Sequence, residues 1–271
     1  MKTASRLLAL SVLATGAVFT TSTFACSTAA WSSVDAAATA GDPLDGIARV
    51  AGKCGLEVTA SGTVLDDTPD GETTFIARFY FFGADLGAGT HEIFSATSAD
   101  AGGGTEQFVV TYDGTDIAVD ASGGGGGSVA SAAEANKWNL VEVMWTSGGN
   151  GSLWVNADAT VDAASGNFAS GSGSIGSAQL GAVGGVGADT AFFDDYVSHR
   201  SLPVGPVLLG DTNNDGQVNV VDATAVLKEA DIFSPQIQDG TPDCNLDGEV
   251  NIVDATGILK AGDIFSPVPC G

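Results

Sequence analysis

Residues 211–222 read Asp-Thr-Asn-Asn-Asp-Gly-Gln-Val-Asn-Val-Val-Asp, and residues 243–254 repeat the pattern as Asp-Cys-Asn-Leu-Asp-Gly-Glu-Val-Asn-Ile-Val-Asp. In both stretches oxygen-bearing side chains occupy positions 1, 3, 5 and 12, with glycine at position 6 and valine at position 8. This is the spacing of a loop that wraps a hard cation in oxygen ligands. The glycine supplies the left-handed backbone conformation that turns the chain around the ion. The sequence therefore predicts two bound calcium ions.

The predicted ligands occupy the same six positions in each loop. Positions 1, 3 and 5 converge as the chain curls, position 7 offers its main-chain carbonyl, position 9 acts through a water molecule, and position 12 closes the site. A small domain of this kind buries little apolar surface, so the ions are also expected to hold it together. The ligand sets are Asp211, Asn213, Asp215, Gln217, Asn219 and Asp222 in the first loop, and Asp243, Asn245, Asp247, Glu249, Asn251 and Asp254 in the second.

A helical pattern follows each loop, and none precedes the first. The preceding segment, residues 202–207, contains two prolines, which argue against an entering helix. After the loops, residues 222–230 and 254–261 have the composition and spacing of short helices. The two units are offset by 243 − 211 = 32 residues and match at nearly every position, so they are a duplication.

With asparagine at positions 3 and 9, aspartate at position 12 and no entering helix, residues from about 210 to 266 resemble the dockerin type I module. The resemblance implies an adaptor that binds cohesin-type protein domains through loop positions 10 and 11 and the following helix, in either of two orientations. Aliphatic residues replace the family's usual Ser-Thr pair at these positions, and such residues suit the helix core equally well. The implied contact residues are Val220, Val221, Lys228, Ile252, Val253 and Lys260.

The N-terminus has the pattern of a secretory signal peptide. Lys2 and Arg6 precede an apolar run from Leu7 to Phe19, and small residues lead to Ala25. The run is too short for a stable membrane anchor, so no membrane span is expected. Residues 1–25 are therefore predicted to be removed, leaving a secreted, extracellular protein that could be attached to a cell surface.

Four cysteines are expected to form two disulfides in an exported protein. The most local of the three connectivities joins Cys26 with Cys54 and Cys244 with Cys270. As an alternative, Cys26 follows Ala25 as the lipidated cysteine of a bacterial lipoprotein would, although the aliphatic residue that usually stands three positions earlier is replaced by Thr23.

Charge excludes some partners. The whole chain carries a formal charge of −24, and removal of Lys2 and Arg6 gives 7 − 33 = −26 for the mature protein. Such an acidic surface argues against nucleic acid and anionic membranes.

The region between the signal and the repeats is predicted to be a β-sandwich, because short strand patterns alternate with turns. The strand containing Trp138, the following Leu-Trp-Val-Asn strand and the closing Phe-Asp-Asp-Tyr-Val strand resemble the concanavalin or laminin G-like jelly roll. The predicted domains are residues 26–203, a linker at 204–210 and the repeats at 211–271. The predicted strands are residues 74–82, 92–96, 107–112, 117–119, 138–145, 152–156 and 191–197.

No catalytic residue is predicted. No glutamate belongs to the Glu-x-Asp-x-x-Glu pattern of glycanases on this fold, and His91 and His199 have no serine or cysteine motif around them. Asp194 and Asp195 could bind a metal or a sugar hydroxyl. Three of the four tryptophans of this region, Trp138, Trp145 and Trp154, could stack on a glycan or fill the core.

Three functions are consistent with these patterns. The preferred one is a non-catalytic protein whose jelly roll binds a carbohydrate or surface ligand and whose repeats attach it to a cohesin-type domain. The alternatives are a polysaccharide-degrading enzyme with an unrecognised site, and a structural surface protein braced by calcium.

Overall fold

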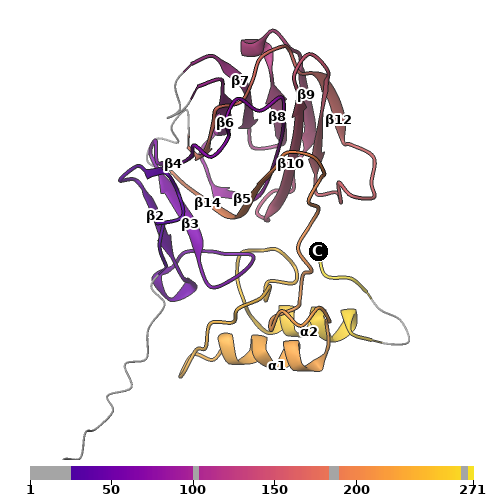
Figure 1. Ribbon diagram of the computed structural model, residues 1–271. Helices are drawn as coiled ribbons and strands as arrows, with labels where there is room; N and C mark the ends of the chain where they lie inside the picture. The colour runs from indigo at the N-terminus through magenta and orange to yellow at the C-terminus, as the bar shows by residue number, and fades with distance from the viewer. Residues whose placement is uncertain (1–25, 100–103, 183–188, 264–267) are drawn as a thin grey trace, which may run out of the picture.

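The computed structural model describes residues 26–99, 104–182, 189–263 and 268–271. The predicted signal peptide, residues 1–25, lies outside the described residues. Most of the described chain forms a β-sandwich, and two short helices lie beneath it at the C-terminal end of the sequence (Figure 1). The predicted fold class, a mainly β sandwich followed by a small helical domain, is confirmed.

Within the described residues, the sandwich consists of two antiparallel sheets of seven strands each. The first sheet has the order β1 (Ser33–Val34), β4 (Thr63–Asp66), β13 (Ser177–Gly181), β6 (His91–Thr97), β7 (Glu106–Tyr112), β8 (Asp116–Asp120) and β9 (Ser128–Ala132). The second has the order β12 (Gly166–Ala169), β11 (Asn150–Val155), β10 (Asn139–Thr146), β5 (Thr74–Asp85), β14 (Thr190–His199), β3 (Gly55–Thr59) and β2 (Ala38–Gly41).

Aromatic side chains join the two sheets. Along β5, Phe75, Phe79 and Phe81 alternate toward the interior, as residues two apart on a strand must, and all three are fully buried. The ring of Phe79 lies 5.5 Å from that of Phe94 on β6, and Phe81 lies 5.1 Å from Tyr112 on β7. The sandwich therefore has a continuous apolar core between its two sheets.

All seven strands predicted from the sequence are present, as β5, β6, β7, β8, β10, β11 and β14. The strands that the sequence analysis missed are short or built from small and polar residues, such as the Ser-Val-Ala-Ser-Ala of β9. Such segments carry little strand preference of their own and become strands because neighbouring strands pair with them. The missed strands are β1, β2, β3, β4, β9, β12 and β13.

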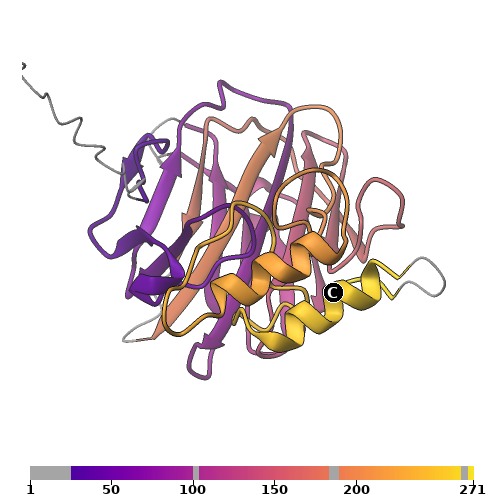
Figure 2. The ribbon, with the colours of Figure 1, turned by 90° about the horizontal axis from the view of Figure 1, so that it is seen from below.

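The C-terminal domain is built around two helices, α1 (Val220–Glu229) and α2 (Ile252–Ala261), which lie side by side across the end of the molecule (Figure 2). Its core is small and consists of Ala223, Val226, Cys244, Ala255 and Ile258. None of the described helices is long and apolar enough to cross a membrane.

Both predicted disulfides are present, joining Cys26 to Cys54 and Cys244 to Cys270. The first ties the N-terminal segment to the residue just before β3, so Cys26 is held in a disulfide and not lipidated in this structure. The second ties the C-terminal tail to position 2 of the second repeat loop. Each bridge stays within one domain.

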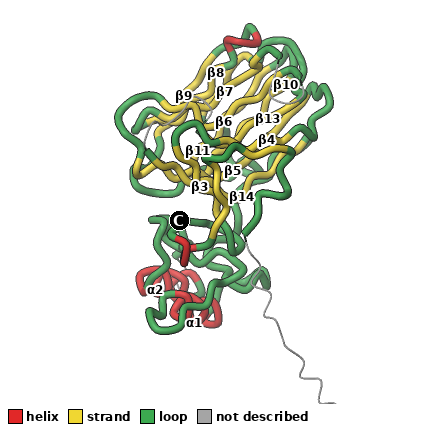
Figure 3. Tube along the Cα trace, turned by 90° about the vertical axis from the view of Figure 1, so that its left-hand side faces the viewer, coloured by secondary structure: helices red, strands yellow, loops and turns green. Residues whose placement is uncertain are grey.

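The C-terminal domain packs against the outer face of the second sheet (Figure 3). Tyr80 and Trp138 are each 1% exposed although they point away from the sandwich core, because residues of the C-terminal domain cover them. The connection between the domains is held as well, since the Val204 and Gly205 amides donate to the buried carboxylate of Glu142 at 2.6 and 2.9 Å. The two domains therefore share a packed interface.

Candidate metal centres and exposed helix surface

The carboxylate at position 1 closes each loop. Asp211 accepts hydrogen bonds from the amides of Asp215 and Gly216, at 3.1 and 2.8 Å. Asp243 makes the same two bonds in the second loop, at 3.2 and 2.8 Å. Gly216 and Gly248 have φ values of +81° and +85°, the left-handed conformation that glycine adopts without strain. The two loops are therefore folded alike, with position 1 bonded to positions 5 and 6.

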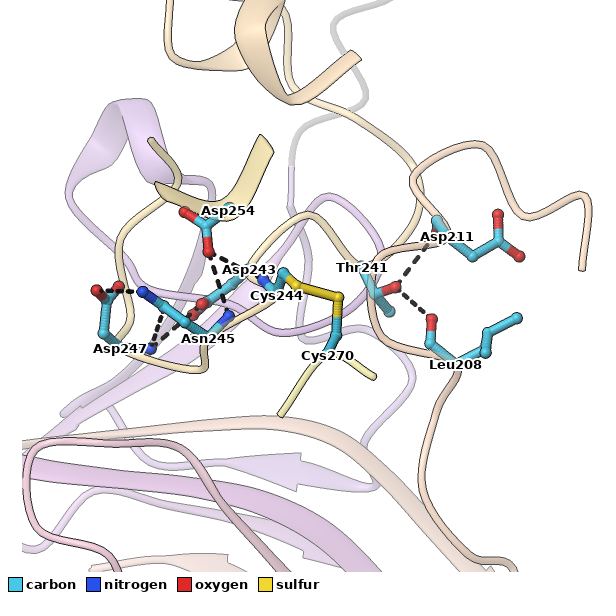
Figure 4. Close-up of a disulfide and its surroundings, with 9 residues drawn as sticks. All are labelled: Leu208, Asp211, Thr241, Asp243, Cys244, Asn245, Asp247, Asp254 and Cys270. Atoms are coloured by element: carbon cyan, nitrogen blue, oxygen red, sulfur yellow. Dashed lines mark hydrogen bonds between the residues drawn. A yellow bond between two sulfur atoms is a disulfide. The ribbon is translucent and has the colours of Figure 1, made fainter. Parts of the chain in front are cut away.

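Positions 3 and 5 are also brought together. The Asn213 side-chain amide donates to Asp215 at 3.1 Å, and the Asn245 amide donates to Asp247 at 2.9 Å. Figure 4 shows Asp243, Asn245, Asp247 and Asp254 gathered on one side of the Cys244–Cys270 disulfide. The first, third and fifth positions thus lie close together in both loops, as the sequence predicted.

Positions 9 and 12 begin the helices. Asn219 accepts from the Val221 amide at 2.8 Å, and Asp222 accepts from the Asn219 amide at 2.9 Å, so the pair forms a capping box at the start of α1. The second oxygen of Asp222 accepts from the Thr212 amide at 3.0 Å. Asn251 and Asp254 repeat the capping box at α2. The sequence analysis missed this capping role, for which the Asn-x-x-Asp spacing was an available signal.

Buried negative charge accumulates in these loops. Asp211 is 5% exposed, and the three carboxylates of Asp222, Asp243 and Asp254 are wholly inaccessible to solvent. Burial, reinforced by the neighbouring charges of Asp254 and Asp247, raises the pKa of Asp243 to about 7. Burial also raises the pKa of Asp254. A cation bound among these carboxylates would offset the free-energy cost of burying their negative charges.

The donor set suits a hard cation, because the predicted ligand positions of each loop carry carboxylate and amide oxygens with no sulfur or imidazole. The described residues do not, however, gather three or more acidic, histidine or cysteine side chains tightly enough to hold a metal by themselves. Both oxygens of the position-12 aspartates are bonded to backbone amides instead. Gln217 and Glu249, at position 7, have exposed side chains, and their main-chain carbonyls remain the predicted ligand atoms.

Comparison with protein families identifies this part of the chain. Residues 209–261 match the family model described as the dockerin type I domain. This segment is a dockerin domain. Dockerin domains generally bind calcium and attach to cohesin-type partners, and the proteins that carry them are in general extracellular or at the cell surface. No curated protein sequence matches the chain.

Solved structures that resemble the region before the dockerin domain do so only weakly. The cellulose-induced protein Cip1 is 12% identical, covering 60% of this chain and 86% of its own, with a TM-score of 0.44. The receptor-binding domain of botulinum neurotoxin type G is 11% identical, with coverages of 64% and 43% and a TM-score of 0.41. Trypanosoma rangeli sialidase is 14% identical, with coverages of 55% and 26% and a TM-score of 0.39. This chain spans less than half of the latter two structures, and likeness at this level says nothing about ligands.

The residues at positions 10 and 11 of the dockerin loops are exposed. Val220 and Val221 are 64% and 58% exposed at the start of α1, and Ile252 and Val253 are 68% and 56% exposed at the start of α2. Lys228 and Lys260 are exposed near the helix ends. The alternative that these aliphatic residues form the helix core is therefore wrong, because other residues form that core.

One further pair belongs to the same surface. Leu227 and Leu259 are 47% and 51% exposed, and each lies seven residues, about two helical turns, after Val220 or Ile252. They therefore extend an apolar stripe along each helix. The sequence analysis missed them, although their matched spacing in the two repeats was a usable signal.

In the sandwich, the three tryptophans that could either stack on a glycan or fill the interior are buried. Trp138, Trp145 and Trp154 are 1%, 0% and 6% exposed, so none of them offers a free face to a glycan. Asp194 accepts from the Val50 and Ala51 amides at 2.6 and 2.7 Å, and burial raises its pKa to about 7.

A cleft of about 440 Å³ opens on the sandwich beside the irregular part of β14, and Asp194 is among the residues that line it. Trp31 and Tyr196 line it with ring centroids 5.0 Å apart, and the Tyr196 hydroxyl donates to Asp66 at 3.0 Å. Asp195, which also lines the cleft, is ion-paired with Arg78. Asp194 and Asp195 were candidates from the sequence, but their grouping with Trp31 and Asp66 was not predicted, because these residues are far apart in the chain.

Proposed function

We propose that this protein is a secreted, non-catalytic attachment protein whose dockerin domain binds two calcium ions and a cohesin-type domain. The observation that carries the proposal is that two near-identical loop–helix units each place the same pair of aliphatic residues in solvent at the start of a helix. The proposed boundaries are residues 26–203 for the sandwich and 211–271 for the dockerin domain, with the linker at 204–210.

The residues proposed to hold the ions are the six at equivalent positions of each loop. Their oxygen chemistry suits calcium, and the raised pKa values of Asp243 and Asp254 show that burial disfavours the charged form of these carboxyls, a cost that a divalent cation would offset. Calcium would supply charge compensation and hold the loop closed. The chain's own residues then set the direction in which each helix leaves its loop.

Exposed aliphatic residues are the argument for a protein partner. Isolated apolar side chains on a surface need no explanation, but here matched residues at the same positions of two helices form a duplicated apolar surface. Such a surface fits an apolar patch on a partner, with acidic residues placed to meet Lys228 and Lys260. Because both copies are exposed, a partner could engage either one.

The test measures binding of the full mature chain, residues 26–271, to a panel of immobilised cohesin domains in calcium. Replacing Val220 and Val221 by aspartate removes one of two equivalent surfaces, so we expect the affinity to fall only about twofold. Replacing Ile252 and Val253 as well should lower it at least about 30-fold, the loss expected for a central contact. EDTA should abolish binding in every variant.

The control is Val161→Asp, which changes an aliphatic residue of the sandwich that is 79% exposed. This variant should bind every cohesin as well as the unaltered chain does. If the chain binds calcium and folds but no cohesin is retained, the attachment role is overturned and the repeats only brace the sandwich.

A second activity, carbohydrate binding by the sandwich, is supported by the cleft beside Trp31. The Trp31 and Tyr196 rings offer a partly exposed aromatic wall, and Asp66 and Asp195 offer carboxylate acceptors for hydroxyl groups. Aromatic rings combined with a few polar groups in a concave site are the usual chemistry of small-ligand binding. The volume of about 440 Å³ would accommodate a short oligosaccharide.

A glycan array probed with the mature chain tests this activity, using Trp31→Ala as the variant. We expect one class of glycan to be retained and its affinity to fall about tenfold or more in Trp31→Ala, since a stacking ring contributes on the order of 1–2 kcal/mol. His199→Ala, an exposed change on the same strand as Tyr196, is the control. Release of reducing sugar from a retained glycan would favour the enzyme alternative instead, and no retained glycan would reject both.

A further inference from the structure

The two dockerin loops are nearly identical in sequence but have different surroundings. At position 4 the first loop carries Asn214 and the second carries Leu246, with similar left-handed φ values of +57° and +60°. Asn214 is exposed, and its side chain donates to the Asp239 carbonyl within the dockerin domain at 3.1 Å. Leu246 points to the sandwich instead. At position 4 the two loops therefore differ both in residue type and in what surrounds the side chain.

Leu246 is docked on the outer face of the second sheet. Its side chain packs against a cluster formed by Val50, Tyr80, Trp138 and Leu140, with Phe82 beside them. Its carbonyl accepts a hydrogen bond from the Trp138 amide at 2.8 Å. The second loop is thus joined to the sandwich by both apolar contact and a main-chain hydrogen bond.

The glycine at position 6 also has different surroundings in the two loops. A Cβ atom built on Gly248 would lie 3.1 Å from the ring of Phe82, so this part of the loop lies against the sandwich. A Cβ atom built on Gly216 would have no described atom within 4 Å. Positions 3 to 6 are half-buried in the second loop and exposed in the first.

We propose that the sandwich is a built-in binding partner of the second calcium loop, so that docking tightens calcium binding at this loop and not at the first. The proposal rests on the proposed calcium binding. The face that receives the loop consists of Val50, Tyr80, Phe82, Trp138 and Leu140.

The physical reason is that docking and ion binding require the same loop conformation. Leu246 lies between Asn245 and Asp247, and its left-handed backbone places its side chain outside the ring that these side chains and Asp243 form. An ion that holds the ring closed also holds Leu246 ready to dock. By reciprocity, a sandwich that holds Leu246 in place favours the ion by the same factor.

The first loop lacks such a link. The sandwich reaches the first repeat and the segment after it through two ion pairs, Arg49 with Glu229 at the last residue of α1 and the exposed Lys53 with Asp239. Neither ion pair includes a predicted ligand of the first loop. The loop ligands Asn213 and Asp215 are exposed. The ion in the first loop should therefore be indifferent to docking, and two sites of nearly the same sequence should differ in affinity.

Leu246→Asn in the full mature chain tests the link, because it gives the second loop the residue that the first loop has at this position. The predicted ligands and the loop conformation are kept, and only the contact with the sandwich is lost. Calcium titration by calorimetry should show one of the two affinities reduced about tenfold, within the 5- to 150-fold range usual for coupled sites. The other affinity should stay unchanged.

Two variants complete the design. Phe82→Ser alters only the sandwich face, leaves the dockerin sequence untouched, and should weaken the same single site. It replaces Leu246→Asn as the deciding variant if the latter lacks the helical far-UV signal in calcium. Asn214→Leu, the reverse exchange in the first loop, should leave both affinities unchanged because Asn214 is exposed and its side chain donates within the dockerin domain and not to the sandwich.

The outcomes separate this inference from the proposed function. Selective loss at one site in both Leu246→Asn and Phe82→Ser supports it. Two bound ions whose affinities stay within about twofold of the unaltered chain overturn it while leaving the calcium proposal intact. A chain that binds no calcium overturns both.

Discussion

Chelation of calcium is expected to unfold the dockerin domain and leave the sandwich folded. A ligand present at a thousand times its dissociation constant stabilises a fold by about 4 kcal/mol, so two sites contribute about 8 kcal/mol. That is as large as the whole stability of many domains, which is about 5–15 kcal/mol. The dockerin core contains only Ala223, Val226, Ala255, Ile258 and the bridged Cys244, and its buried aspartates would repel one another without the ions.

Circular dichroism distinguishes the two domains. All four tryptophans lie before residue 155, so the near-ultraviolet signal reports the sandwich, whereas both α-helices of the described residues lie in the dockerin domain. EDTA should remove the helical signal and preserve the near-ultraviolet signal except for the contribution of Trp138, which the dockerin domain covers. An unchanged helical signal and melting temperature in EDTA would contradict the proposed calcium requirement.

Asp243→Asn gives the matched mutational test. This change removes one carboxylate from the second loop, and it should raise the calcium concentration needed to fold the domain. Asp70→Asn removes one exposed carboxylate from the sandwich, and it should leave the calcium dependence unchanged. Equal effects of the two changes would mean that net charge, and not loop ligation, controls the response.

Glu229→Ala is expected to destabilise the dockerin domain of the full chain by about 3–5 kcal/mol, since it leaves a buried charge without its partner. Arg49 and Glu229 lie 2.6 Å apart, with side chains 0% and 3% exposed. Arg49 also donates to the Gly240 carbonyl at 3.2 Å, and its Nε has no hydrogen-bond partner among the described residues. Denaturant unfolding in calcium, followed by the helical signal, measures the loss.

A second ion pair across the same interface provides the control. Lys53 and Asp239 lie 3.0 Å apart, but their side chains are 42% and 68% exposed. Asp239→Ala should therefore cost no more than about 1 kcal/mol, because water screens an exposed pair. A double exchange, Arg49→Met with Glu229→Leu, should recover most of the stability lost in Glu229→Ala. Similar losses of stability in Glu229→Ala and Asp239→Ala would show that burial of the Arg49–Glu229 pair does not increase the cost of breaking it.

Features that depend only on residues close together in the chain could be predicted from the sequence. The ring of positions 1, 3, 5 and 6 in each loop depends on chain geometry over a few residues, so spacing alone indicated it. The aromatic strands of the sandwich, such as β5 and β10, were also predicted. Their side chains prefer extended structure, and each strand is long enough for this preference to be recognised in the sequence. Strands such as β13, Ser-Ala-Gln-Leu-Gly, were missed because pairing with β4 and β6 makes them strands.

The sequence by itself determined the duplicated dockerin loops and the mainly β fold before them, because short-range geometry and composition specify both. It left three disulfide connectivities open, and the structure selects the most local of them. Only the tertiary structure decided which apolar residues face solvent. Val220 and Leu246 are both aliphatic residues of a dockerin loop, yet one is exposed and the other docks on Trp138. Burial depends on what covers a side chain, and the covering residues come from elsewhere in the chain, as Arg49 and Glu229, 180 residues apart, also show.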